Sequence, residues 1–201
     1  MTPGGAATMN VMASYRIDDV SLRDVPDDVE AAWARVRELE AQDDAGGGER
    51  VVWLRMLGEL AAAEELGWAL LVRAGGPPDV EAARQRPSLP LAALGPTVRL
   101  AHVLQWQGRF ADAEELFATA IASADALAGA SPPGSPEQAA ATAMTAFGRQ
   151  HLGKSRFDEG RYTEALELFE RALAIRLASS APADQIASSR QAVAATRHRL
   201  A

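Results

Sequence analysis

The sequence predicts an all-α protein, a right-handed α-solenoid of antiparallel helix pairs, and three observations support this. Alanine is abundant and β-branched residues are sparse, which favours helix. Apolar residues recur at helical spacing along most of the chain. Residues 100–121 align without a gap on residues 152–173, with eight of 22 positions identical. An internally repeated helix pair, whose apolar face needs a neighbour, is typical of a solenoid.

The N-terminal quarter of the chain carries little of this pattern. Residues 1–14 are small and polar, without a period, and we expect disorder there. Residues 15–26 alternate apolar and charged side chains, and we assign no element to them. The next segment predicts an amphipathic helix over 27–42, with Asp27 and Asp28 able to cap it. Residues 43–48, DDAGGG, predict a flexible break, so the N-terminal segment 15–48 would contain one helix.

A repeat array is predicted over 49–201, and its first member is degenerate. Residues 49–74 contain no proline, which indicates one long helix, or two with a kink near Gly67. Residues 75–78, GGPP, would form the turn, and 79–86 a short second helix. The predicted degenerate repeat therefore covers 49–86.

Two clearer repeats are expected over 91–128 and 136–179. Gly95-Pro96 should interrupt the first helix near its start. The second repeat opens with Ser135 as N-cap, Pro136 at the first helical position and Gln138 closing a capping box. Residues 184–200 predict a capping helix, which is polar on one side as the end of a solenoid requires.

The better copy has a recognisable order of residues. Leu152-Gly153 is followed by Gly160, Tyr162, Ala165, Phe169 and Ala172-Leu173. This order resembles the tetratricopeptide repeat (TPR), in which a Leu-Gly, a turn glycine, an alanine and an aromatic residue build two antiparallel helices. The upstream copy departs from the pattern at Ala101, where glycine is expected. The copies lie 52 residues apart rather than the usual 34, so the resemblance is to a lengthened-helix type, and the composition is typical of a high-GC bacterium.

Composition excludes several classes of function. The net charge is −7 with both signs interspersed, which argues against nucleic acid or an anionic membrane as the main partner. The absence of cysteine excludes disulfides, thiol nucleophiles and cysteine-ligated metals. No run of 18 apolar residues and no convincing signal peptide are present, so we expect a cytoplasmic protein.

Catalytic and cofactor motifs are also missing. The three histidines, His102, His151 and His198, have no metal-ligand spacing such as HxxxH, although the first two might meet across neighbouring helices. GxSxG, a Walker loop and GxGxxG do not occur. We therefore predict no catalytic residues, no metal, no cofactor and no enzyme activity.

The resemblance to TPR arrays implies a partner-binding concave face, lined by the first helix of each pair. By position in the repeat, its residues would be Val98, His102, Gln105, Trp106, Gln150, Lys154, Phe157 and Asp158. Trp106 is a candidate peptide anchor, although it could instead pack under the neighbouring helix. A lysine–asparagine clamp for a terminal carboxylate cannot be built, because Lys154 is the single lysine and Asn10 the single asparagine.

The sequence thus predicts a non-catalytic scaffold or adaptor that binds an unidentified protein or peptide and can self-associate as a homodimer. The alternative is a small-molecule sensor or enzyme with a pocket between the helix 49–74 and the first clear repeat. That pocket would be lined by His102, Trp68 and Trp106.

Overall fold

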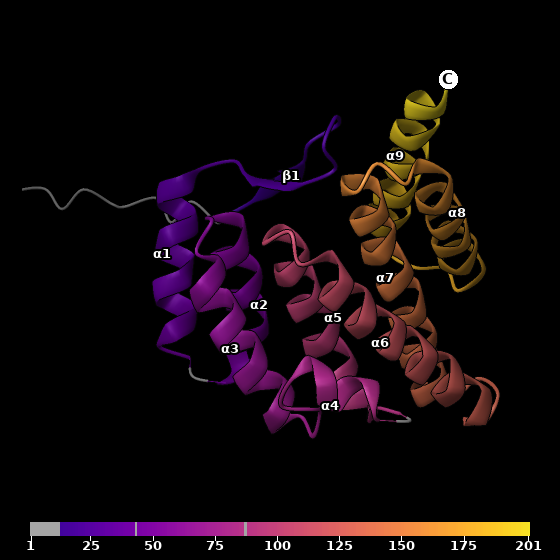
Figure 1. Ribbon diagram of the computed structural model, residues 1–201, viewed down its shortest axis with the longest axis horizontal. Coiled ribbons are helices and arrows are strands. Elements are labelled where there is room, and N and C mark those ends of the chain that lie inside the picture. Colours follow the sequence, from indigo (N-terminus) through magenta and orange to yellow (C-terminus); the bar gives the residue numbers. More distant parts are fainter. Residues whose placement is uncertain (1–12, 43, 87) are drawn as a thin grey trace, which may run out of the picture.

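The computed structural model describes residues 13–42, 44–86 and 88–201. Within them nine helices follow in chain order: α1 (Val29–Glu40), α2 (Asp44–Met56), α3 (Leu60–Arg73), α4 (Val80–Arg84), α5 (Leu91–Trp106), α6 (Phe110–Ala130), α7 (Pro136–Asp158), α8 (Tyr162–Ala178) and α9 (Ala183–Leu200). Most helices pack against their neighbours in sequence, in one curved row (Figure 1). The predicted all-α solenoid is therefore confirmed.

The unassigned segment 15–26 forms a small β-hairpin. Strands β1 (Tyr15–Ile17) and β2 (Asp24–Pro26) pair antiparallel, with Arg16 opposite Val25. Asp18 shapes the connecting loop, because its carboxylate accepts hydrogen bonds from the backbone N–H groups of Val20 and Ser21. The alternation of apolar and charged residues therefore reflects strands with two different faces.

Three helix pairs share one turn design. Gly58 between α2 and α3, Gly108 between α5 and α6, and Gly160 between α7 and α8 all have φ between 75° and 84°. Glycine adopts this left-handed conformation without the steric cost that a side chain brings. Five residues after each glycine stands an alanine with no exposed surface, at positions 63, 113 and 165. The first helix pair is therefore α2–α3.

This assignment corrects the predicted first repeat. The helix expected over 49–74 is broken at Gly58, and Gly67 lies inside α3, which is continuous from Leu60 to Arg73. The break expected over 43–48 is wrong from Asp44 onward, because α2 begins there; residue 43 is outside the described residues. Gly46 and Gly47 lie so close to Leu39 and Leu70 that a Cβ would be 2.9 Å from either side chain. Close packing, rather than flexibility, explains these glycines.

The structure changes two predicted details of helix capping, at the start of α1 and at the start of α7. Asp28 caps α1 and accepts from the N–H groups of Glu30 and Ala31, so the helix is shorter than 27–42. Ser135 caps α7 as predicted, but the Gln138 side chain accepts from the N–H of Gly134 instead of closing the capping box.

The expected interruption of the helix in the first clear repeat is wrong. Helix α5 runs through Gly95-Pro96 without a break. The predicted disorder of residues 1–14 falls largely outside the described residues, of which Ser14 binds Asp27.

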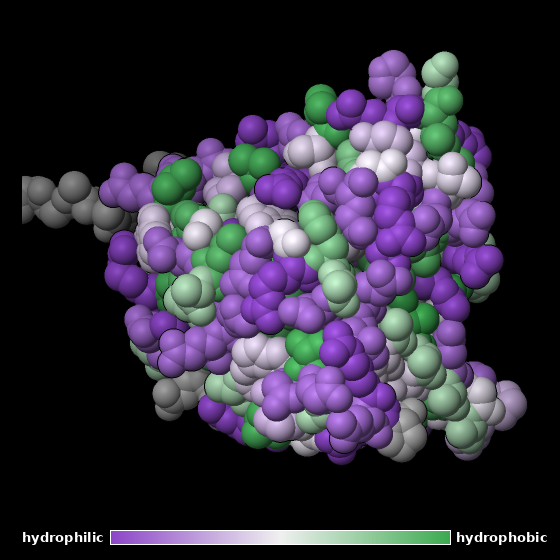
Figure 2. Space-filling model, viewed as in Figure 1, coloured by the Kyte–Doolittle hydropathy of each residue, from purple (hydrophilic) through white to green (hydrophobic). Residues whose placement is uncertain are grey.

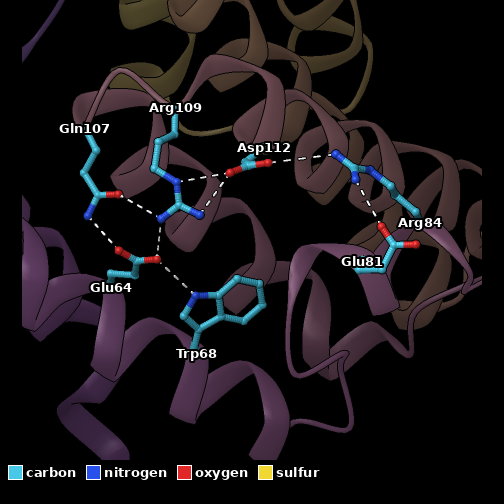
Figure 3. Close-up of polar contacts among 7 residues, drawn as sticks. All are labelled: Glu64, Trp68, Glu81, Arg84, Gln107, Arg109 and Asp112. Carbon is cyan, nitrogen blue, oxygen red and sulfur yellow. Dashed lines mark hydrogen bonds and ion pairs between the residues drawn. The ribbon is translucent and has the colours of Figure 1, made fainter.

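A polar network ties neighbouring helices together at the edge of the array (Figure 3). The Glu64 carboxylate on α3 accepts from Arg109 at 2.6 Å and from Gln107 at 2.8 Å, and Arg109 also binds Asp112. Arg84 on α4 lies 3.9 Å from the same Asp112. These groups are partly exposed, so each pair contributes little, but together they connect α3 and α4 with α6 and with the turn that precedes it. Over the face shown in Figure 2, charged and apolar side chains are interspersed.

Candidate functional site

The predicted concave face is covered by the chain's own hairpin. Figure 1 shows β1 and its loop stretched past α5, from the α1–α2 end of the array to α7 and α9. The far end is held by Gln191 on α9, which donates to the carbonyl of Ile17 at 3.1 Å and to Asp19 at 2.6 Å. Arg199 donates to the carbonyl of Val20 at 3.1 Å. The hairpin therefore bridges the first and last helix pairs.

Asp24 is the polar centre of this contact. Its Oδ2 accepts from Arg55 of α2 at 2.7 Å and its Oδ1 from Lys154 of α7 at 2.8 Å, and all three side chains are buried. Burial alone would raise the pKa of Asp24, but the charges and hydrogen bonds of Lys154 and Arg55 outweigh it and hold this pKa well below its ordinary range. One carboxylate thus pairs with two buried cations, one on α2 and one on α7.

A second ion pair and an aromatic contact flank this centre. Arg23 donates to Asp158 of α7 at 3.0 Å, and Gln105 of α5 donates to the same oxygen at 3.1 Å. The guanidinium groups of Arg23 and Arg55 lie 5.0 and 4.8 Å from the centre of the Trp106 ring. Trp106 is therefore neither a free anchor for a partner peptide nor a simple core residue, because cations of the hairpin and of α2 cover its ring.

Leu22 provides the apolar anchor of the hairpin. Its side chain is 1% exposed and packs in the cluster that contains Phe157 of α7, Phe169 of α8 and Val193 of α9. Its φ of 58° is uncommon for a residue with a side chain and costs about 1–2 kcal/mol. Burial of a leucine is worth about 1.5–3 kcal/mol, which offsets the strained backbone.

Two histidines meet beneath the hairpin, as the sequence allowed. The ring centres of His102 and His151 lie 4.4 Å apart. Burial, assisted by the charges of Arg55 and Lys154, lowers the pKa of both histidines well below their ordinary value of about 6.5. Both are therefore neutral near pH 7. Among the residues described, no group of three or more His, Cys, Asp or Glu side chains is arranged to hold a metal ion.

The hairpin does not fill the concave face completely. A cavity of about 730 Å³ remains between β1–β2, α7, α8 and α9, and its walls include Lys154, Arg176, Gln150 and Phe147. A smaller cavity of about 90 Å³ lies between α2 and α5 beside His102. A third hollow of about 400 Å³ lies between α8 and α9 and is lined by Leu173, Leu177 and Val193.

The eight predicted groove residues lie on α5 and α7. Those buried in contact with the hairpin or its neighbours are Val98, His102, Gln105, Gln150, Lys154 and Phe157; Trp106 and Asp158 lie at its partly exposed margin. Sequence reasoning missed Arg55, which precedes its turn glycine by three residues, as Gln105 does. It also missed Asp24, Leu22 and Arg176.

The cavity of about 90 Å³ between α2 and α5 lies where the alternative hypothesis expected a pocket, and His102 lines it, but Trp68 and Trp106 do not. His102 lies 6.2 Å from Trp106, ring centre to ring centre, on the concave side. Trp68 lies elsewhere, where its Nε1 donates to Glu64 in the network of Figure 3 and its ring packs against the cluster around Leu71. The break at Gly58 explains this separation, because it turns α3 back along α2.

Comparisons with known proteins agree with the helix pairs. A family model described as tetratricopeptide repeat matches residues 98–137 and 149–179. Searches of curated proteins and of solved structures gave no match. None of the helices described is long and apolar enough to cross a membrane. Residues 98–137 and 149–179, which contain most of α5–α6 and α7–α8, are therefore tetratricopeptide repeats.

Proposed function

We propose that this chain is a non-catalytic scaffold or adaptor that binds a protein or peptide partner on the concave face of its short repeat array. Repeats of this family generally mediate protein–protein interaction. The observation that carries the proposal is the hairpin itself, because the face holds an extended segment through a buried carboxylate and a buried leucine. The face thus has the features that a strand-like ligand requires.

The charges of this face define the partner we propose. Arg23, Arg55 and Lys154 face two carboxylates, those of Asp24 and Asp158, so the centre retains one positive charge. A partner segment with an acidic residue next to an apolar one would reproduce what Leu22 and Asp24 provide. In this proposal such a segment replaces the hairpin, which otherwise covers the groove.

A peptide of residues 14–28 tests the proposal on the full chain. The Asp24→Asn chain, whose hairpin is weakened, should bind this peptide, whereas the wild type should not because its own hairpin competes. A matched peptide with Asn in place of Asp24 should bind about tenfold more weakly, since it lacks the charge that both cations need. Fluorescence anisotropy measures both. Equal binding of the two peptides, or none up to millimolar concentration, would reject the groove as the partner site.

Identification of the natural partner uses the same variant. Affinity capture from the host's lysate should recover a partner more strongly with Asp24→Asn than with wild type. A Trp106→Ala/Lys154→Ala variant of unchanged helicity should lose it. Equal capture by all three would place the partner on another surface.

Self-association is a second candidate, and the hollow between α8 and α9 favours it. Leu177 at its rim is 49% exposed beside Leu173 and Val193. We propose that this end of the array pairs with a second copy as a homodimer. Sedimentation velocity should show a dimer that Leu177→Glu dissociates, and a monomer at all concentrations would contradict it. A cytoplasmic location stays a prediction from the lack of cysteine, of a long apolar run and of a convincing signal peptide. The prediction that neither nucleic acid nor a membrane is the main partner rests on the mixed charge.

A further inference from the structure

One buried arginine lacks the partner that the other buried arginines have. Arg55, Arg156 and Arg176 are each at most 4% exposed. Arg55 pairs with Asp24, and Arg156 pairs with Glu159 and Glu114. Arg176 on α8 has no ion pair within the described part of the chain. A buried charge without a counter-ion is strongly destabilising, so a bound anion would stabilise this side chain.

Within the described part of the chain, the hydrogen bonds of Arg176 all come from one nitrogen of its guanidinium, Nη1. Nη1 donates to the carbonyl of Gln185 at 2.8 Å, to Ser189 Oγ at 2.7 Å and to Gln150 Oε1 at 3.4 Å. Nε has no partner among the residues described. These neutral acceptors hold the side chain in place, but none of them carries a charge. Burial accordingly lowers the pKa of Arg176, and Asp184 opposes this only in part.

Two further polar groups on the walls of the same 730 Å³ cavity lack partners. Gln150 Nε2 and His151 Nδ1 are buried without a hydrogen bond in the described part of the molecule. The amide N–H of Gln150 can only donate, as can the free N–H groups of Arg176. Two of these unpartnered groups, Gln150 Nε2 and Arg176 Nε, are therefore donors, and donors are the groups that receive an anion.

We propose that the cavity between hairpin β1–β2, α7 and α9 binds an organic anion with a single carboxylate, and that Arg176 recognises this carboxylate. The lining and adjacent cations are Arg55, Lys154 and Arg176, against the carboxylates of Asp24 and Asp184, so one positive charge is left. A monoanion neutralises it, whereas a dianion such as phosphate would leave a net negative charge.

The rest of the cavity fits the body of such a ligand. Ile17 and Phe147 give it apolar walls, and a volume of about 730 Å³ suits a small organic molecule or the end of a peptide. The inference goes beyond the proposed function, because the hairpin stays in place here as one wall. A free small acid and the terminal carboxylate of a peptide share the required chemistry, and the test separates them.

The experiment titrates the full chain with hexanoate and benzoate, each beside its neutral amide. The acids should bind about tenfold more tightly than hexanamide and benzamide, and they should shift the Nε–H resonance of Arg176. Arg176→Gln should abolish the difference between acid and amide. The matched control Arg171→Gln, an exposed arginine on the same helix, should retain it. Equal affinity of acids and amides, or a preference that survives Arg176→Gln, would overturn the proposal.

A second variant keeps the test decisive if Arg176→Gln does not fold. Ala187→Trp fills the cavity from α9 and leaves Arg176 intact. It should lose the binding of both acids, and retained binding would overturn the proposal. A short peptide with a free C-terminus, compared with its amidated form, distinguishes the source of the carboxylate. Binding by the free peptide alone would support a peptide terminus, and binding by the small acids alone would support a free acid.

Discussion

Replacement of Asp24 by Asn gives the sharpest test of how the hairpin is held. The substitution keeps the size of the side chain but removes the charge that faces Arg55 at 2.7 Å and Lys154 at 2.8 Å. Loss of one partner from a buried ion pair costs about 3–5 kcal/mol, because the remaining charge stays unpaired and dehydrated. Two buried cations would lose their carboxylate here. The smallest loss of stability therefore results if the hairpin detaches and water hydrates both cations.

Two measurements distinguish a hairpin that stays docked from one that detaches. Urea unfolding at pH 7 should show a loss that reaches about 3–5 kcal/mol if the hairpin stays docked and less if it detaches. Hydrogen exchange should then become faster at the N–H of Leu22, which is bonded to Asp18 at 2.9 Å, while the helices keep their protection. The control Asp27→Asn removes an exposed pair with Arg16 and should change stability by less than about 1 kcal/mol.

The acid limb of the stability curve supplies an independent check. Because the pKa of Asp24 is lower in the folded than in the unfolded chain, its contribution is complete above about pH 4–5 and is lost as the pH falls further. Asp24→Asn should flatten this limb. Stability within about 1 kcal/mol of wild type, with unchanged exchange of the hairpin, would refute the reasoning, because two buried cations cannot lose the carboxylate that both contact without consequence.

The other predictions concern protonation, the apolar anchor and packing. Because the pKa values of His102 and His151 are lower in the folded than in the unfolded chain, the unfolded chain takes up protons first as the pH falls. The free energy of unfolding should therefore fall by up to about 2.7 kcal/mol per pH unit below pH 6. Urea titrations should show a shallower fall for the variant in which both histidines are replaced by Gln. Leu22→Ala should release the hairpin, seen as faster exchange there with unchanged helicity by circular dichroism. Gly153→Ala should cost about 1–3 kcal/mol in thermal unfolding, because its Cβ would lie 2.6 Å from Phe169, whereas Gly129→Ala, with open space around it, should stabilise α6 by about 0.5–1 kcal/mol.

Local signals in the sequence were sufficient for the later helix pairs. Ser135-Pro136 begins α7, and the turn glycines at 108 and 160 were identified from the aligned copies. Capping and left-handed turns depend on a few adjacent residues, so they can be predicted without knowledge of the fold. The same alignment placed the eight concave-face residues on α5 and α7.

The first helix pair could not be found in this way. Gly58 repeats the turn signal, but its aromatic partners are missing, and Gly67 stands where Phe117 and Phe169 stand in the other pairs. Residues 44–48 read as a linker because glycine has a poor helix propensity. Their contact with Leu39 and Leu70 overrides that propensity, and such a contact exists only once α1, α2 and α3 are assembled.

The sequence by itself therefore determined that this chain is a solenoid of TPR-like helix pairs. The set of side chains that lines its concave face stays a prediction from the repeat pattern. Only the tertiary structure decided what occupies that face. Asp24 and Lys154 are 130 residues apart in the chain, and Leu22 reaches a cluster formed by α7, α8 and α9. Contacts over such separations leave no periodic trace in the sequence, because their partners are chosen by how the helices stack. The lack of an ion pair at Arg176 is likewise known only from the tertiary structure, because it depends on where the neighbouring carboxylates lie.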